Sequence, residues 1–101
     1  MDFKSSFYEV VNAVDSELEK RIENAYGYRS NAYIVGDPNN PIFRNNSTLD
    51  ILTEVMVRYR NGGWDAKIVM IEIPLENELK PNSTITLRGG NMRVPKLQVN
   101  W

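Results

Sequence analysis

The sequence predicts an α+β fold, in which a long N-terminal amphipathic helix and a second helix pack on a small, mostly antiparallel sheet. Three observations lead to this prediction: apolar residues at helical spacing in the first quarter of the chain, a turn rich in proline and asparagine after it, and alternating apolar residues near the C-terminus. With 101 residues, 42% of them hydrophobic and 25% charged, residues 1–101 are expected to form a single domain.

The first helix is expected from Ser5 to about Tyr26, with Ser5 or Ser6 as its N-terminal cap and Gly27 as its C-terminal cap. Its apolar stripe consists of Phe7, Val11, Val14, Leu18, Ile22 and Ala25. Its solvated face carries Asp15, Glu19, Lys20 and Glu23. A helix of about 20 residues is roughly 30 Å long, close to the diameter of a small domain. Part of the apolar stripe would then extend past the sheet, so a homo-oligomer is expected.

The next segments indicate short extended elements separated by a turn. Tyr28 to Val35 has the alternation of a strand, and Gly36 to Pro41 has the proline, aspartate and asparagine of a turn. Ile42 to Arg44 is expected to be a short extended return.

Residues 48–61 allow two interpretations. As a helix, the segment has Ser47 as its N-cap with Asp50 three residues later, and Glu54 and Arg58 form a favourable i, i+4 pair. As a strand, Val55, Val57 and Tyr59 alternate with polar residues, and Asn61-Gly62 becomes a hairpin turn. We favour the helix because the cap and the charge pair support only that interpretation.

The second half is expected to supply most of the sheet. Residues 67–73, KIVMIEI, are apolar on both faces in the middle and are expected to form a central strand covered by a helix on at least one face. A polar loop, a strand at 84–88 and a tight hairpin at 88–93 would follow. The last strand alternates at Leu97, Val99 and Trp101, and Pro95 would place it at an edge of the sheet.

Two missing residue types exclude many functions. The chain has no cysteine and no histidine, so thiolate metal sites, Ser-His-Asp triads and histidine-bound metals cannot be built. No glycine-rich phosphate loop is present. The loop that starts at Asp37 does not match a calcium loop, because proline occupies its third ligand position, and Glu72, Glu76 and Glu78 are scattered carboxylates. We therefore expect a protein that is not an enzyme and has no cofactor or metal.

Charge argues against binding to nucleic acid through a broad basic surface, since the formal net charge is -1 and the pI is about 5.4. Residues 1–50 hold five cations and eight anions, whereas residues 51–101 hold seven cations and five anions. We therefore expect any anion-binding face in the second half. The N-terminus lacks a secretory pattern and no window is long and apolar enough to span a bilayer, so a cytoplasmic protein without membrane contact is expected.

One group of residues has the chemistry of a nucleotide site. Arginine binds phosphate through two parallel hydrogen bonds, aromatic rings stack on bases, and glycine allows close approach of a ligand. The candidate ligand-binding residues are Arg58, Tyr59, Arg60, Trp64, Arg88, Asn91 and Arg93. The alternative is that the arginines are solvated and that Trp64 belongs to the core.

The stretch RYRNGGWDAKIVMIEI, residues 58–73, resembles an arrangement found in small phage-encoded α+β proteins. This resemblance implies a virion accessory, an inhibitor of a host enzyme or an anti-defence protein that sequesters a nucleotide signal. Our first hypothesis is a non-catalytic binding protein for an anionic nucleotide-derived ligand. The alternative is a protein-interaction module, an inhibitor or scaffold, that acts through the acidic face of the first helix.

Overall fold

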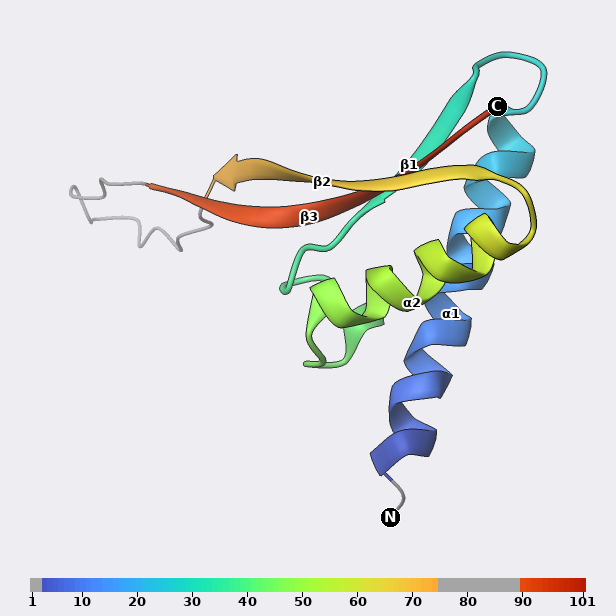
Figure 1. Cartoon of the computed structure of the whole chain (residues 1–101). Helices are drawn as coiled ribbons and strands as arrows, with labels where there is room; N and C mark the ends of the chain where they lie inside the picture. Colours follow the sequence, from blue (N-terminus) through green and yellow to red (C-terminus); the bar gives the residue numbers. More distant parts are fainter. Residues whose placement is uncertain (1–2, 75–89) are drawn as a thin grey trace.

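The computed structural model describes residues 3–74 and 90–101, and it confirms the α+β fold. Two helices pack on one face of a three-stranded antiparallel sheet (Figure 1). The elements in chain order are α1 (Phe3–Ala25), β1 (Asn31–Val35), the short 3-10 helix η1 (Pro41–Phe43), α2 (Thr48–Asn61), β2 (Asp65–Pro74) and β3 (Asn91–Asn100).

The strand order β1-β3-β2 corrects two predictions. The KIVMIEI strand lies at an edge of the described sheet, and the last strand lies at its centre despite Pro95. The carbonyl of Pro95 accepts a hydrogen bond from the amide of Gly36 at 2.7 Å. In a hydrogen-bonded antiparallel pair both backbone groups of a residue face the same neighbour. The missing N–H of Pro95 therefore faces the chain that leaves β1, and the ladder to β2 loses no bond.

Close packing explains why residue 36 is a glycine. A Cβ atom placed there would lie 2.9 Å from Cγ of Pro95 and 3.0 Å from side-chain atoms of Leu52 and Thr48. Distances this short require neighbouring atoms to move. The end of β1 can therefore approach both β3 and α2 only without a side chain.

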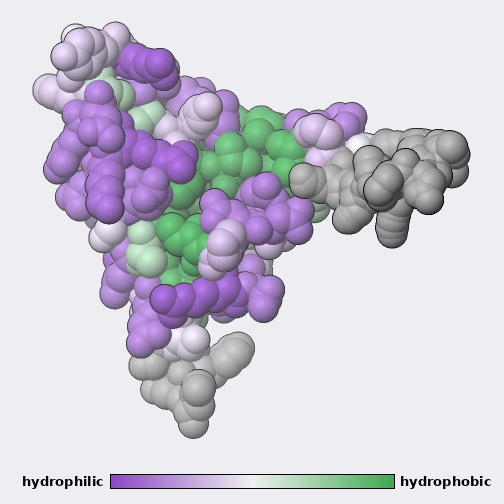
Figure 2. Space-filling view, turned by 180° about the vertical axis from the view of Figure 1, so that it is seen from behind, coloured by the Kyte–Doolittle hydropathy of each residue, from purple (hydrophilic) through white to green (hydrophobic). Residues whose placement is uncertain are grey.

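Beyond β1, the paired strands β2 and β3 continue as a two-stranded ribbon away from the helices (Figure 1). In this ribbon Met70 to Pro74 pair with Asn91 to Pro95. Figure 2 shows apolar side chains gathered on one side of the molecule next to the grey residues, with hydrophilic side chains around them.

The core lies between the two helices and the helix-facing side of the sheet. Its fully buried side chains come from both helices, η1, β1 and β3, and β2 adds Ala66 at 2% exposure; the fully buried residues are Val10, Val11, Val14, Leu18, Ile34, Phe43, Ile51, Leu52, Val55, Leu97 and Val99. Four of these belong to the predicted stripe of α1 or lie next to it. The described part of the chain contains no helix with both the length and the apolar character needed to cross a bilayer.

Several local predictions change in the structure. Helix α1 begins at Phe3, so the predicted caps Ser5 and Ser6 lie inside it. Residues 41–43 are a 3-10 helix and not an extended return, because the side chain of Asn40 accepts a bond from the Ile42 amide at 3.0 Å. The predicted strand at 84–88, together with the start of the predicted hairpin, lies outside the described residues.

Residues 48–61 form a helix, which confirms the favoured interpretation. The hydroxyl of Ser47 accepts the amide of Asp50 at 3.3 Å, as predicted for an N-cap. At the other end Gly63 has a φ of +90°, a conformation that suits glycine, and its amide donates to the Arg60 carbonyl. The Trp64 amide donates to the Tyr59 carbonyl at 3.0 Å. These two bonds form a Schellman motif, which brings the Trp64 side chain back against Tyr59.

Candidate binding sites around the C-terminal half of α1

The described residues do not bring the predicted arginine site together. Arg58 donates to Asn12 at 2.8 Å and to Asp15 at 3.3 Å, both on α1, whereas Nε of Arg60 donates to the Ala66 carbonyl at 2.7 Å. Two residues apart on a helix correspond to about 200° of rotation. The two guanidinium groups therefore point to different neighbours and do not face one ligand.

The remaining predicted residues lie in other places. Arg93 is on the ribbon opposite Glu72, and the Asn91 amide donates to the Glu72 carboxylate at 3.4 Å. Arg88 lies outside the described residues. Tyr59 and Trp64 contact each other at the end of α2, with ring centroids 6.0 Å apart. Tyr59 and Trp64 therefore belong to a different site. The acidic residues of that site were predicted to lie on the solvated face of the first helix.

That site is a cavity of about 590 Å³ between α1 and the C-terminal end of α2, which we call the acidic groove. Its lining residues are Asp15, Glu19, Ile22, Glu23, Tyr26, Arg58, Tyr59, Gly62 and Trp64. Three carboxylates at intervals of four residues follow one side of α1, because residues four apart lie one above the other on a helix. Part of the predicted solvated face is thus one side of a cavity.

Three aromatic rings line the groove, those of Tyr26, Tyr59 and Trp64, and Trp101 contacts two of them; we call these four rings the aromatic wall. Tyr59 contacts Trp64 edge to face, Trp64 contacts Trp101 in the same way at 6.2 Å, and Trp101 stacks on Tyr26 at 5.6 Å with an interplanar angle of 27°. The amide of Trp101 donates to the Ser30 carbonyl at 2.8 Å, which fixes the end of the chain beside α1. Such ring arrangements are favourable beyond their burial alone.

The lining of the groove carries three carboxylates and one guanidinium group. Asp15 is paired with Arg58, but Glu19 and Glu23 are exposed on the groove side of α1. The C-terminal end of α2 reaches the groove at Gly62, but the amides of Gly62, Gly63 and Trp64 already bond to its last carbonyl groups, so the carboxylates are the main attraction for a cation. Burial raises the pKa of Tyr59 well above its ordinary value of 10.0, and the carboxylates of Asp15 and Glu19 raise it further. Tyr59 therefore stays protonated and neutral.

This chemistry suits a cation. Carboxylates accept hydrogen bonds from ammonium and guanidinium groups, and aromatic rings attract cations over their faces. Within residues 3–74 and 90–101, no group of three or more acidic side chains has the arrangement of a metal site. The carboxylates and rings of this lining have the chemistry to contact an organic cation such as a basic side chain.

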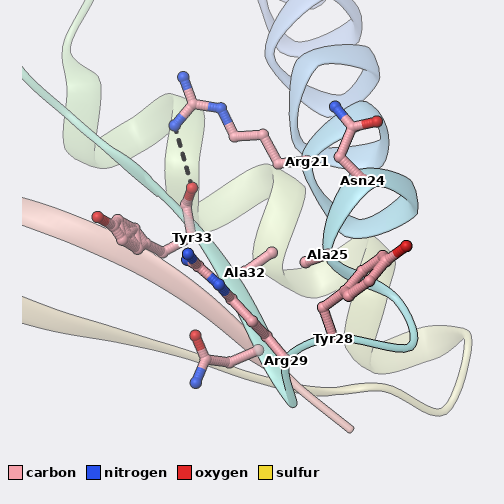
Figure 3. A pocket seen from close by; sticks show the side chains of 8 residues that line it. Arg21, Asn24, Ala25, Tyr28, Arg29, Ala32 and Tyr33 are labelled. Atoms are coloured by element: carbon pink, nitrogen blue, oxygen red, sulfur yellow. Dashed lines mark hydrogen bonds between the residues drawn. The ribbon is translucent and has the colours of Figure 1, made fainter.

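A second cavity, of about 480 Å³, lies on another side of the same half of α1, and we call it the basic pocket (Figure 3). It is lined by Arg21, Asn24, Ala25, Tyr28, Arg29, Asn31, Ala32 and Tyr33. The lining contains two arginines and no carboxylate. Arg21 donates to Glu17 at 3.1 Å and to the Tyr33 carbonyl at 3.2 Å, the second of which is the dashed line in Figure 3.

Sequence patterns predicted the acidic residues of α1 and the rings of Tyr59 and Trp64, but not Tyr26, Trp101 or any residue of the basic pocket. Periodicity could have placed Tyr26, because it lies one turn after Ile22. The run YGYR, residues 26–29, is a sign of the basic pocket, because a glycine that caps a helix sets the direction of the residues that follow it. Trp101 had no such signal, because only the pairing of β1 and β3 brings it beside Tyr26.

Comparison of the chain with protein-family models, with curated proteins and with solved structures gave no match. The function proposed below is therefore based on the chemistry of the two cavities.

Proposed function

We propose that the protein is a non-catalytic interaction module that holds a basic segment of a protein partner in the acidic groove. The observation that supports this proposal is that Glu19 and Glu23 line one cavity between α1 and α2 together with rings of the aromatic wall. The proposal follows the alternative hypothesis from the sequence, in which the acidic face of the first helix contacts a partner.

Carboxylates alone do not explain such a site. A solvent-exposed ion pair contributes about 0–1 kcal/mol, so two exposed glutamates would give weak and unselective attraction. A ring face adds about 0.5–2 kcal/mol for a cation placed over it. Tyr26 is 61% exposed and provides such a face next to Glu23. The combination favours arginine, whose planar guanidinium stacks on a ring and donates to a carboxylate at the same time.

The geometry of the groove is fixed before a ligand arrives. Arg58 holds α2 to α1 through Asn12 and Asp15, and the Schellman motif fixes Trp64 against Tyr59. Tyr59 is 9% exposed and Trp64 packs against the core. A site that is already formed avoids part of the entropy cost of ordering side chains on binding.

The finer expectations from the sequence stay predictions. They are a phage origin, an anti-defence role, a homo-oligomer and a cytoplasmic location. The absence of histidine and cysteine from the chain supports binding without catalysis.

Titration of the protein with a fluorescent peptide of alternating arginine and glycine tests the proposal. We expect binding to the wild type and a dissociation constant about tenfold higher for the double variant Glu19→Gln, Glu23→Gln, because two ion pairs of about 0.7 kcal/mol each are lost. A peptide with glutamine in place of arginine should not bind.

The matched control is the double variant Glu54→Gln, Glu72→Gln, which removes the same charge outside the groove. It should bind the arginine peptide within about twofold of the wild type, since distant surface charges act only through the screened field of the whole protein. Equal weakening in both double variants would mean that net charge alone attracts the peptide. That result would contradict a binding site in the groove.

A further inference from the structure

The basic pocket carries an inference of its own, which does not rest on the proposed function. We infer that it binds a nucleotide unit, with the phosphate on Arg29 and Arg21 and the base against Tyr28. The first hypothesis from the sequence had the same ligand class but placed it on second-half arginines. The pocket lies entirely in the first half of the chain.

Phosphate recognition follows from the two arginines. The side chain of Arg21 is held by Glu17 and by the Tyr33 carbonyl, so its guanidinium group has a fixed position at the pocket. Glu17 offsets part of the charge of Arg21, which makes Arg29 the main positive group of the lining. A guanidinium group binds phosphate oxygens through two parallel hydrogen bonds. A ligand with a phosphate group therefore suits the two arginines better than a ligand with a single carboxylate group.

The backbone around Gly27 places Arg29. Gly27 has a φ of +90°, and the amides of Tyr28 and Arg29 both donate to the Ala25 carbonyl at 2.9 Å. These two bonds also use part of the acceptor capacity at the C-terminal end of α1, where free carbonyls would repel an anion. The turn therefore sets the position of Arg29 and reduces the repulsion that a phosphate would meet.

The aromatic residues of the pocket provide a surface for a base. Tyr28 is 87% exposed, which leaves both faces of its ring accessible to a planar ligand. The ring of Tyr33 has Lys96 above it, with Nζ 4.9 Å from the ring centroid, so Tyr33 presents less free surface than Tyr28. In Figure 3 the side chain of Arg29 lies between those of Tyr28 and Tyr33. Every base has a flat face that can stack on an aromatic side chain, so the ring of Tyr28 can hold a base whatever its identity.

The size and the remaining polar groups fit the same ligand. A cavity of about 480 Å³ lies within the range of about 300–1,000 Å³ seen for small-molecule sites. Asn24 and Asn31 belong to the lining, and a side-chain amide can both donate to and accept from the edge of a base. A ligand with a phosphate alone would use the arginines but leave Tyr28 and these amides without a partner.

Calorimetric titration with adenosine monophosphate, adenosine, inorganic phosphate and a short single-stranded oligoadenylate tests the inference. Adenosine monophosphate should bind more tightly than adenosine or phosphate alone, since only it contacts both the arginines and Tyr28. Tighter binding of the oligoadenylate than of adenosine monophosphate would identify a nucleic-acid strand as the source of the ligand. Equal or weaker binding of the oligonucleotide would identify a free nucleotide.

The variants Arg29→Gln and Tyr28→Ala should each raise the dissociation constant of adenosine monophosphate by about tenfold or more, because a charged hydrogen bond or a stacking contact is lost. Both residues are exposed, so the melting temperatures should stay those of the wild type. The matched control Arg93→Gln, on the ribbon, should bind like the wild type. No heat with adenosine monophosphate, or a loss caused by Arg93→Gln and not by Arg29→Gln, would overturn the inference.

Discussion

The acidic groove and the basic pocket flank the same half of α1 and carry opposite charge. Glu19 and Glu23 face the groove, whereas Arg21 lies two residues from each and faces the pocket. Two residues correspond to about 200° around a helix, so alternation of acidic and basic residues at this spacing separates them onto opposite sides. A charge count over half of the chain averages these two sides and hides both sites.

The two sites also differ in how they are attached to the fold. The groove includes Tyr59 and Trp64, which belong to the core or pack against it, and the pocket ends in the exposed ring of Tyr28. Changes of Tyr59 or Trp64 should therefore affect stability as well as binding, whereas changes of Tyr28 should affect binding alone. This difference separates the residues that build a site from those that only contact a ligand.

The largest expected effect on stability follows from Trp64→Ala. Loss of this ring removes the contacts with Tyr59 and Trp101 and leaves a gap beside the core, which should lower the free energy of unfolding by about 2–3 kcal/mol. Tyr28→Ala, which removes a ring of the pocket, should change it by less than about 0.5 kcal/mol. Urea unfolding of the two variants beside the wild type measures both values. Similar destabilisation by the two changes would show that the pocket is also part of the core.

A smaller effect is expected from the titration of Tyr59 in the groove. The pKa of Tyr59 in the folded protein is raised above its unfolded value of 10.0. Above pH 10 the unfolded state therefore binds fewer protons than the folded state, and the free energy of unfolding falls as the pH rises. The slope from this residue is at most about 1.4 kcal/mol per pH unit, and the contribution is complete below pH 10.

Tyr59→Phe isolates this contribution, because it removes the hydroxyl and keeps the ring of the aromatic wall. Urea unfolding between pH 9 and 11 should show a steeper loss of stability for the wild type than for this variant. Parallel curves would mean that Tyr59 is as solvated as an ordinary surface tyrosine and that the groove is less negative than its carboxylates imply.

Sequence analysis predicted the elements whose signals are local. The stripe of α1, the Ser47 cap of α2 and the glycine-rich end of α2 each depend on residues within a few positions of one another, and all three are confirmed. The position of the last strand depends on long-range contacts, and its prediction as an edge strand was wrong. Pro95 indicated an edge strand, but the contact between its carbonyl and the amide of Gly36 allows it to lie in the central strand.

The same distinction applies to the sites. Sequence reasoning selected residues by their type, so it grouped arginines that the fold separates: Arg58 binds α1, Arg60 binds the start of β2, and Arg93 lies on the ribbon. It recognised the acidic face of the first helix because helical spacing is visible in the chain. Trp101 joined the aromatic wall only through the pairing of β3 with β1, which no local pattern reveals.

The most direct test of two sites with opposite charge on one helix is a nuclear magnetic resonance titration of the ¹⁵N-labelled protein with the arginine-glycine peptide and, separately, with adenosine monophosphate. The peptide should shift the indole signal of Trp64 and the amide signal of Glu23. Adenosine monophosphate should shift the amide signals of Tyr28 and Arg29 and leave the Trp64 indole unchanged. Shifts of one common set of signals by both ligands, or of neither set, would contradict the account.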